Sequence, residues 1–354
     1  MGSLKVAWLV SCLTMSPATT LAEPAQQVLP HGPCGGLPPL EVSWRFGTGA
    51  RPVASASVAG DGSVYVGTSE GYVHALREDG SYLWSYTLQG PVSGRSALSL
   101  FGALLVPSGR SIYALRPNGT LLWAFQSPLR VLGDLARDGR GRFHFASHDG
   151  RLFALSSAGE LITHVPGRVA FSALQVELPD GAIAAGRRNG EVLLVPTSGR
   201  TSRFALPAAP SALLGCPGAR LCAIAGGTLY ALVEAAGHPE HPWSTLAVRA
   251  GASAELLAVL PSDSSLEVFG GESRQRLFSR ALPESASAAP VLDAQGTSYI
   301  SLRTGALVAI ARSGKLVGCA EVGRSALGAA VYDRERRRVL VTAAEGVLAA
   351  VAVE

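Results

Sequence analysis

Apolar and polar residues alternate along the stretch GYVHALREDGSYLWSY, which begins at Gly71. Alternation with a period of two is typical of a β-strand, and Glu78-Asp79-Gly80 has the composition of a tight turn. A second short apolar run follows the turn and contains Trp84. The stretch therefore predicts a β-hairpin whose second strand carries an aromatic residue.

Degenerate copies of this hairpin recur along the chain at intervals of about 40 residues. The equivalent positions in the eight copies are Ala75, Ala114, Ala154, Leu194, Ala231, Val268, Ala309 and Ala350. Repetition at this interval indicates a propeller or a solenoid, because each unit can bury its apolar face only against its neighbours.

Most units carry a large ring at the same place in the outer strand. The ring positions are Trp44, Trp84, Trp123, Phe204, Trp243 and Phe278. Aromatic side chains bury a large apolar area, so we predict that these rings act as wedges between adjacent sheets.

The two ends of the repeat region complement each other. Leu40–Phe46 matches an outer strand that lacks the three strands expected before it, whereas the last unit has three strands and no outer one. Pairing the two ends would remove the exposed strand edges of an open array. We therefore predict that the N-terminal strand closes a ring by lying beside Val347–Val353.

The N-terminus has the features of an export signal. A basic start, the apolar run Val6–Met15 and small residues up to Ala22 predict a signal peptide over residues 1–22. A Pro- and Gly-rich tether is expected over residues 23–39, followed by the repeat domain over residues 40–354. In a second interpretation Cys12 is lipidated, and only then would the chain associate with a membrane. We expect a periplasmic or secreted protein, with an outer-membrane lipoprotein facing the periplasm as the alternative.

The composition indicates an oxidising compartment and argues against a nucleic-acid partner. Charged residues make up only 16% of the chain and apolar ones 47%, which suits a globular core. No basic stripe interleaved with aromatics indicates a nucleic-acid site. Four cysteines follow residue 22, namely Cys34, Cys216, Cys222 and Cys319. An even number suits two disulfides in an oxidising space: Cys216 and Cys222 would cross a hairpin, while Cys34 and Cys319 are either bonded or unpaired.

Several polar groups are candidate ligands, but their spacing and numbers favour simpler structural roles. His238-Pro239-Glu240-His241 has no helical zinc spacing and predicts a surface loop, and His144 and His148 predict two polar positions on one face of a strand. The recurring turn aspartates are Asp61, Asp138, Asp180 and Asp293. Each turn offers one carboxylate, whereas calcium takes about six to eight oxygens, so these residues predict turns. The cluster Arg334–Arg338 predicts a solvated hairpin turn and the best local site for an acidic partner.

The pattern VYVGTSEGYVHALREDGSYLW resembles the pyrroloquinoline-quinone-type (PQQ-like) β-propeller repeat. The resemblance extends over Leu40–Glu354 and implies an all-β, eight-bladed β-propeller of four-stranded blades. The family includes quinoprotein dehydrogenases, which hold a quinone and calcium in the central funnel, and non-catalytic propellers such as the lipoprotein scaffold of the outer-membrane β-barrel assembly machinery.

The residues favour the non-catalytic branch. The chain has no adjacent cysteine pair, its Trp residues after the signal are already assigned to outer strands, and its two asparagines, Asn118 and Asn189, lie in turns. We therefore expect no catalytic, cofactor-binding or metal-binding residues and no cofactor. The sequence predicts an exported, monomeric binding or scaffolding module for a protein or another envelope macromolecule. The alternatives are a lipoprotein scaffold of the β-barrel assembly type and a quinone- or sugar-binding enzyme.

Overall fold

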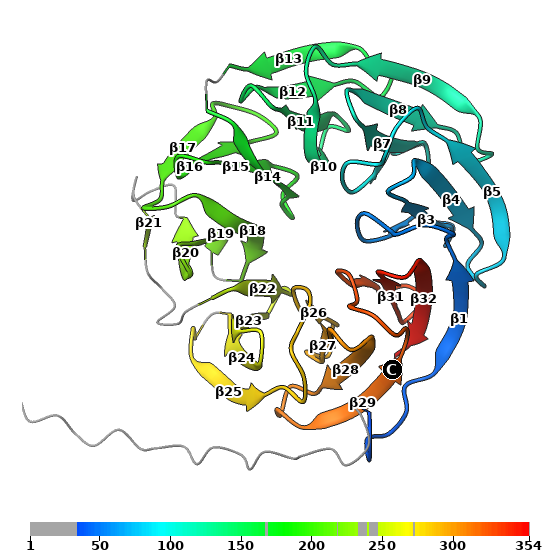
Figure 1. Ribbon diagram of the computed structural model, residues 1–354. Coiled ribbons are helices and arrows are strands. Elements are labelled where there is room, and N and C mark those ends of the chain that lie inside the picture. Colours follow the sequence, from blue (N-terminus) through cyan, green and yellow to red (C-terminus); the bar gives the residue numbers. More distant parts are fainter. Residues whose placement is uncertain are drawn as a thin grey trace, which may run out of the picture.

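The protein is a ring of eight four-stranded antiparallel sheets (Figure 1). The computed structural model describes residues 34–166, 169–217, 219–232, 239–240, 247–271 and 273–353. Strands account for all the regular secondary structure of these residues. In this part of the chain no helix has the length and apolar character needed to cross a membrane. The predicted all-β, eight-bladed propeller is confirmed.

The first four blades follow one another along the chain, each running from the channel outward. Blade one consists of β2 (Ser57–Val58), β3 (Val64–Gly67), β4 (Tyr72–Leu76) and β5 (Tyr82–Thr87). Blade two consists of β6 (Ala97–Leu98), β7 (Leu104–Ser108), β8 (Ser111–Leu115) and β9 (Leu121–Gln126). Blade three consists of β10 (Val131–Arg137), β11 (Phe143–Ser147), β12 (Leu152–Leu155) and β13 (Leu161–Val165). Blade four consists of β14 (Phe171–Glu177), β15 (Ile183–Arg187), β16 (Glu191–Val195) and β17 (Ser202–Ala205).

The remaining blades complete the ring, and the last one combines both ends of the chain. Blade five consists of β18 (Pro210–Cys216), β19 (Ala219–Ala225), β20 (Thr228–Leu232) and β21 (Pro239–Glu240). Blade six consists of β22 (Arg249–Ala252), β23 (Leu256–Ser262), β24 (Ser265–Gly270) and β25 (Arg276–Ala281). Blade seven consists of β26 (Val291–Leu292), β27 (Ser298–Ser301), β28 (Ala306–Ile310) and β29 (Leu316–Glu321). Blade eight consists of β30 (Val331–Asp333), β31 (Arg338–Ala343), β32 (Val347–Ala352) and β1 (Val42–Gly47).

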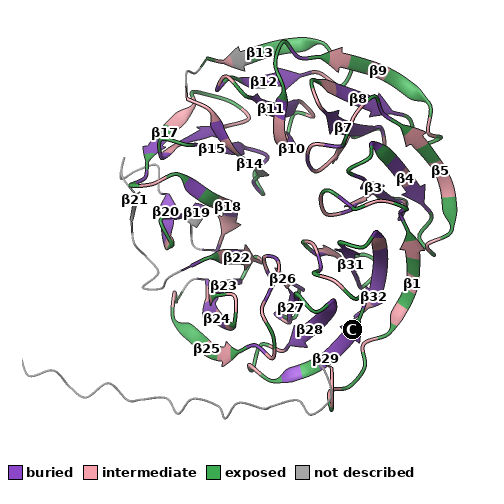
Figure 2. Cartoon of the chain, viewed as in Figure 1, coloured by how far each residue is buried: buried purple, intermediate pink, exposed green. Residues whose placement is uncertain are grey.

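The core lies between the blades, where the middle strands are covered on both faces (Figure 2). Every residue of β7, β11 and β28 is buried, and these strands read as nearly continuous apolar runs. Outer strands such as β5 alternate between exposed and half-buried residues, because only one face meets the next blade. Burial on both faces explains why the repeat signal is strongest in the middle of each unit.

Ring closure occurs as the sequence predicted. Strand β1 pairs antiparallel with β32, with Val42 opposite Val351 and Gly47 opposite Val347. The N-terminal strand thus supplies the missing outer strand of blade eight and leaves no open sheet between the first and last units.

The innermost strand of blade one is shorter than its apolar pattern suggests. The sequence predicts a strand over Val53–Val58, whereas β2 covers only Ser57–Val58 and is preceded by a single bridge between Pro52 and Thr68. Proline has no N–H group to continue a ladder, and the chain bends directly afterwards.

The end of the expected tether is attached to blade seven. Pro39 forms a parallel bridge with Cys319, and the N–H of Leu40 donates to the Cys319 carbonyl at 2.8 Å. Leu40 lies over Gly318, where an added Cβ would come within 2.5 Å of the Leu40 side chain. In blade seven, Gly318 stands at the outer-strand position that carries an aromatic ring in most other units. The Leu40 side chain occupies the space beside this glycine. Residues 34–39 are therefore no free tether; residues 1–33, with the predicted signal peptide and Cys12, lie outside the described residues.

Candidate binding site at the channel mouth

The predicted wedge rings contact the turn of the following blade. The Trp44 indole lies against Gly80, and its Nε1 donates to the Glu78 carbonyl at 3.0 Å. Trp84 and Trp123 repeat this contact, with Nε1 donating to the carbonyls of Pro117 at 2.7 Å and Ser157 at 3.0 Å. The ring of one unit and the turn glycine of the next are thus two halves of one contact.

The other predicted rings show variations of this arrangement. Phe278 lies against Gly314, the turn glycine of blade seven. Phe204 is buried in the core between blades four and five. Trp243 lies outside the described residues.

Both candidate cysteine pairs are disulfide-bonded in the structure. Cys216 and Cys222 bridge neighbouring strands of blade five, with their Cα atoms 5.6 Å apart. Cys34 and Cys319 join the N-terminal segment to blade seven, with their Cα atoms 5.3 Å apart. Both Cα distances lie in the usual range for disulfides.

The histidines do not form the pairs suggested by the sequence. His144 is buried in β11, and its Nε2 lies 3.0 Å from Oδ2 of Asp138. His148 is exposed and lies beyond the end of β11, so the two do not share a strand face. Pro239 and Glu240 form the short strand β21, which replaces the expected surface loop at that point; His238 and His241 lie outside the described part of the chain.

The turn aspartates accept hydrogen bonds from their own turns. Oδ1 of Asp138 accepts from the N–H groups of Arg140 and Arg142, and Oδ2 accepts from the Arg142 guanidinium at 2.6 Å. Burial alone would raise the pKa of Asp138, but the hydrogen bonds from His144 and Arg142 outweigh it and hold that pKa well below its usual range. Gly141 has the positive φ that this turn requires.

In the cluster Arg334–Arg338, Arg334, Glu335 and Arg337 are exposed as expected for a solvated turn, whereas Arg336 and Arg338 make structural contacts that were not predicted. Arg338 is buried, pairs with Asp333 at 2.9 Å and donates to the Gly62 carbonyl of blade one at 3.0 Å. Arg336 pairs with Glu78 of blade one at 3.0 Å. These contacts could not be read from the sequence, because they join turns of the first and last units that meet only once the ring closes.

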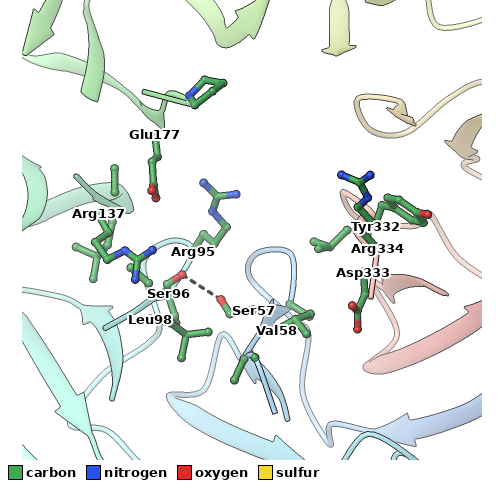
Figure 3. Close-up of a pocket in the computed structure, with 18 of the residues that line it drawn as sticks. Ser57, Val58, Arg95, Ser96, Leu98, Arg137, Glu177, Tyr332, Asp333 and Arg334 are labelled. Carbon is green, nitrogen blue, oxygen red and sulfur yellow. Dashed lines mark hydrogen bonds between the residues drawn. The ribbon is translucent and has the colours of Figure 1, made fainter. Parts of the chain in front are cut away.

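A cavity of about 1040 Å³ opens where the inner strands of five blades surround the central channel (Figure 3). We call this region the channel mouth; its walls come from β2, β6, β10, the end of β14 with its turn, and β30. The lining includes Ser57, Val58, Arg95, Leu98, Arg137, Glu177, Tyr332, Asp333 and Arg334. Ser57 Oγ donates to the Ser96 carbonyl at 3.0 Å, which joins the inner strands of blades one and two.

The lining of the channel mouth carries equal numbers of basic and acidic side chains, namely Arg95, Arg137, Arg334 and Arg336 against Glu177, Asp180, Asp333 and Glu335. Arg95, Arg137 and Arg334 make no ion pair with the described residues, whereas Arg336 pairs with Glu78 of blade one and Asp333 pairs with Arg338 of its own blade. Figure 3 shows the Glu177 side chain directed toward Arg95 and Arg137, with Arg334 across the cavity. Partial burial raises the pKa of Glu177, while the two nearby guanidinium groups lower it; burial prevails.

An exposed apolar tip lies in the turn that follows β6, the strand of blade two that lines the channel mouth. Leu100 and Phe101 form the turn between β6 and β7, and 69% and 85% of their surfaces are exposed. This pair is not among the predicted sites, although the sequence holds a signal for it: the aligned turn of unit one carries Gly60 and Asp61 in these places. Large apolar groups in a turn that is polar in unit one indicate a contact with another molecule.

The side chains that line the site suit binding of a polar or charged group. Within the described residues, no three or more His, Cys, Asp or Glu side chains lie together in an arrangement that could hold a metal ion. The three available guanidinium groups can instead form charge-assisted hydrogen bonds with carboxylates or other oxyanions.

Comparisons with known proteins agree with the sequence pattern. Residues 41–207 match the family model described as outer membrane protein assembly factor BamB. The predicted resemblance to PQQ-like propeller repeats is thereby confirmed. Among curated proteins, none matches the sequence of the chain.

Three solved structures have a similar fold. BamB from Moraxella catarrhalis is 15% identical with a TM-score of 0.72, and the match covers 89% of this chain and 98% of that one. The computationally designed Ika8 protein is 15% identical with a TM-score of 0.71, covering 90% and 99%. Saccharomyces cerevisiae Sqt1 is 12% identical with a TM-score of 0.75, covering 89% and 100%. At these identities the likeness shows the fold alone.

Proposed function

We propose that this protein is an exported, non-catalytic β-propeller that binds another protein in the cell envelope and acts there as a scaffold. The observation that carries the proposal is the channel mouth on a closed ring, where Arg95, Arg137 and Arg334 make no ion pair with the described residues, together with the exposed Leu100–Phe101 tip in the turn after β6. Binding residues on turns that a rigid framework positions are typical of recognition sites. The match of residues 41–207 to a family of outer membrane assembly factors supports a protein partner.

The proposed compartment is the periplasm or the extracellular space. Two disulfides support it, because disulfides persist in oxidising compartments. Mass spectrometry of the mature protein tests the route: cleavage after Ala22 gives a soluble protein, and a lipid-modified Cys12 gives the outer-membrane lipoprotein. Recovery of an uncleaved chain from the cytoplasm would contradict export.

A quinone- or sugar-binding enzyme is the second candidate function. The positions of three tryptophans argue against it. Trp44, Trp84 and Trp123 hold the outer rims of blades, so none can serve as a stacking floor in the channel. A thermal melt with and without pyrroloquinoline quinone plus calcium tests this candidate. We expect no shift of the melting temperature and no dye-linked oxidation of alcohols or sugars; a clear upward shift or such oxidation would favour the enzyme.

The scaffold role is tested by affinity purification from the envelope fraction of cells that make the protein. We expect the wild type to retain a partner that F101D retains at least about fivefold less, since a charge in the apolar contact carries a desolvation cost. Y82D is the matched control, because Tyr82 is 55% exposed but lies on the outer strand β5. A partner that F101D and Y82D retain equally would contradict binding at the channel mouth.

A further inference from the structure

We propose that two copies of this chain associate edge to edge, with β9 of one copy pairing antiparallel with β9 of the other. The contact is centred on blade two, and the outer strands β5 and β13 of the neighbouring blades flank it. This inference goes beyond the proposed function, does not involve the channel mouth, and departs from the monomer expected from the sequence.

The outer strands of blades one to three carry no charged side chain. β5, β9 and β13 lie next to one another along the rim (Figure 1), and their sequences YLWSYT, LLWAFQ and LITHV contain no Asp, Glu, Lys or Arg. Each of the other five outer strands has at least one such residue, namely Arg45 in β1, Arg203 in β17, Glu240 in β21, Arg276 and Arg280 in β25, and Glu321 in β29. Charged side chains normally protect an edge strand from pairing with another chain. That protection is missing on three consecutive blades.

The same three strands expose large apolar side chains where they begin. Between 39% and 55% of the surface is exposed at each of Tyr82 in β5, Leu121 and Leu122 in β9, and Leu161 and Ile162 in β13. Among the described residues of the other outer strands, only β25 and β29 expose a large apolar side chain, one in each. A band of exposed apolar residues on neighbouring elements indicates a contact with another molecule.

The backbone of β9 is available for strand pairing. β9 is the outermost strand of blade two and pairs with β8 on one side, and no described strand lies on its other side. The Arg116 guanidinium donates to the Leu121 carbonyl at 2.8 Å, so the part of the edge that another strand can reach runs from Leu122 to Gln126. Such an edge binds an extended strand through main-chain hydrogen bonds.

The extent of the uncharged band indicates that the occupant is a second copy of the ring. A single strand of another protein would cover the edge of one blade and leave the apolar residues of both neighbouring blades exposed. When two rings meet at blade two, their β5 and β13 strands are the next closest to the contact, because these strands lie on either side of β9 (Figure 1). A two-fold contact pairs the β9 strands antiparallel and closes after two copies.

The test is the molar mass of the mature protein, measured by size-exclusion chromatography with light scattering. An edge contact is small, so we expect association of micromolar strength and twice the mass of one chain at about 100 µM. L122K should raise the dissociation constant of the dimer at least about tenfold, because the two-fold contact brings two ammonium groups together in place of two leucines.

The matched control is L277K in the outer strand of blade six. Leu277 is 44% exposed and Leu122 is 40% exposed. Each directly precedes the ring residue of its strand, which is Phe278 in β25 and Trp123 in β9. Because β25 already carries charged residues, we expect L277K to leave the dissociation constant unchanged.

A second pair of variants and hydrogen exchange separate a lost contact from misfolding. A124K in β9 and S279K in β25 change exposed residues that directly follow the ring residue, and only A124K should weaken the dimer. All four variants should melt at the temperature of the wild type. In the wild type, the amides of Leu122–Gln126 should exchange more slowly at high than at low protein concentration, whereas the amides of β25 should not respond.

A monomer at about 100 µM, equal effects of L122K and L277K, or unchanged exchange in β9 would overturn the inference. Growth beyond two copies would also overturn it, because a two-fold contact closes. If the wild type is monomeric and L122K no longer retains the envelope partner, another protein occupies the β9 edge and the inference is wrong.

Discussion

The stability of the protein in acid depends on the ionisation of the Asp138 side chain. Its buried carboxylate accepts hydrogen bonds from Arg140, Arg142 and His144. Because its pKa in the folded state lies below the unfolded value of about 4, the carboxylate stabilises the fold above that value. This stabilisation is lost as the pH falls from about 4 toward the folded-state pKa.

We expect D138N to lower the free energy of unfolding at pH 7 by about 1–3 kcal/mol, because buried donors lose a charged acceptor. Denaturant unfolding between pH 7 and pH 2 measures the effect, and the difference from the wild type should shrink below about pH 4. The control D61N alters an exposed turn whose aspartate accepts one backbone hydrogen bond from Ser63, and it should cost less. A pH-independent difference would contradict the assignment.

Gly80 and Trp44 test the contact between blades at a single position. Gly80 has φ +82°, and an added Cβ would lie 2.5 Å from the Trp44 ring. Gly49 has φ +68° with nothing within 4 Å of an added Cβ. We expect G49A to cost about 1 kcal/mol of unfolding free energy from backbone strain, and G80A to cost about 1–3 kcal/mol more from displacement of the indole. Equal losses in denaturant unfolding would show that the ring does not act as a wedge.

The closing strand makes a prediction at the scale of an element. Deleting residues 23–33 should leave the melting temperature unchanged, since the attached segment begins at Cys34. Deleting residues 23–46 removes β1 and exposes the edge of β32, which should cause aggregation. Size-exclusion chromatography distinguishes the two, and a monomeric longer deletion with an unchanged melting temperature would contradict closure by β1.

The two disulfides should differ in their contribution to stability. Cys34 and Cys319 are 285 residues apart in sequence, and Cys216 and Cys222 are 6 apart. In the chain-entropy model the first contributes about 5.6 kcal/mol and the second about 2 kcal/mol. We therefore expect C34S/C319S to lower the denaturant midpoint more than C216S/C222S. Non-reducing peptide mapping is the control, and recovery of Cys216 and Cys222 as free thiols from exported protein would contradict their pairing.

Features with a repeating signal could be predicted, and contacts formed by ring closure could not. The hairpin pattern around Trp84 repeats often enough to reveal eight units and an incomplete end. The blade-joining role of Arg338 and the attachment of Leu40 over Gly318 depend on which units become neighbours in space. The Phe101 tip was predictable in principle, because it departs from the turn pattern of unit one.

At the scale of the whole molecule, the closed ring holds the channel mouth in a fixed shape. Neighbouring blades are joined by the outer-strand rings and, between blades one and eight, by Arg336 and Arg338. A framework joined in this way changes little on binding, so the partner should meet a preformed surface. The central claim is that this surface binds a protein.

Site-specific photo-cross-linking in the envelope tests that claim most directly. A photoreactive amino acid replaces Phe101 in the turn after β6, Arg51 in a pocket separate from the channel mouth, or Tyr82 on the outer strand β5, each in otherwise wild-type protein. We predict one discrete protein adduct from position 101, identified by mass spectrometry, and none of that mass from positions 51 and 82. The same adduct from all three positions, or no protein adduct at position 101, would contradict the account.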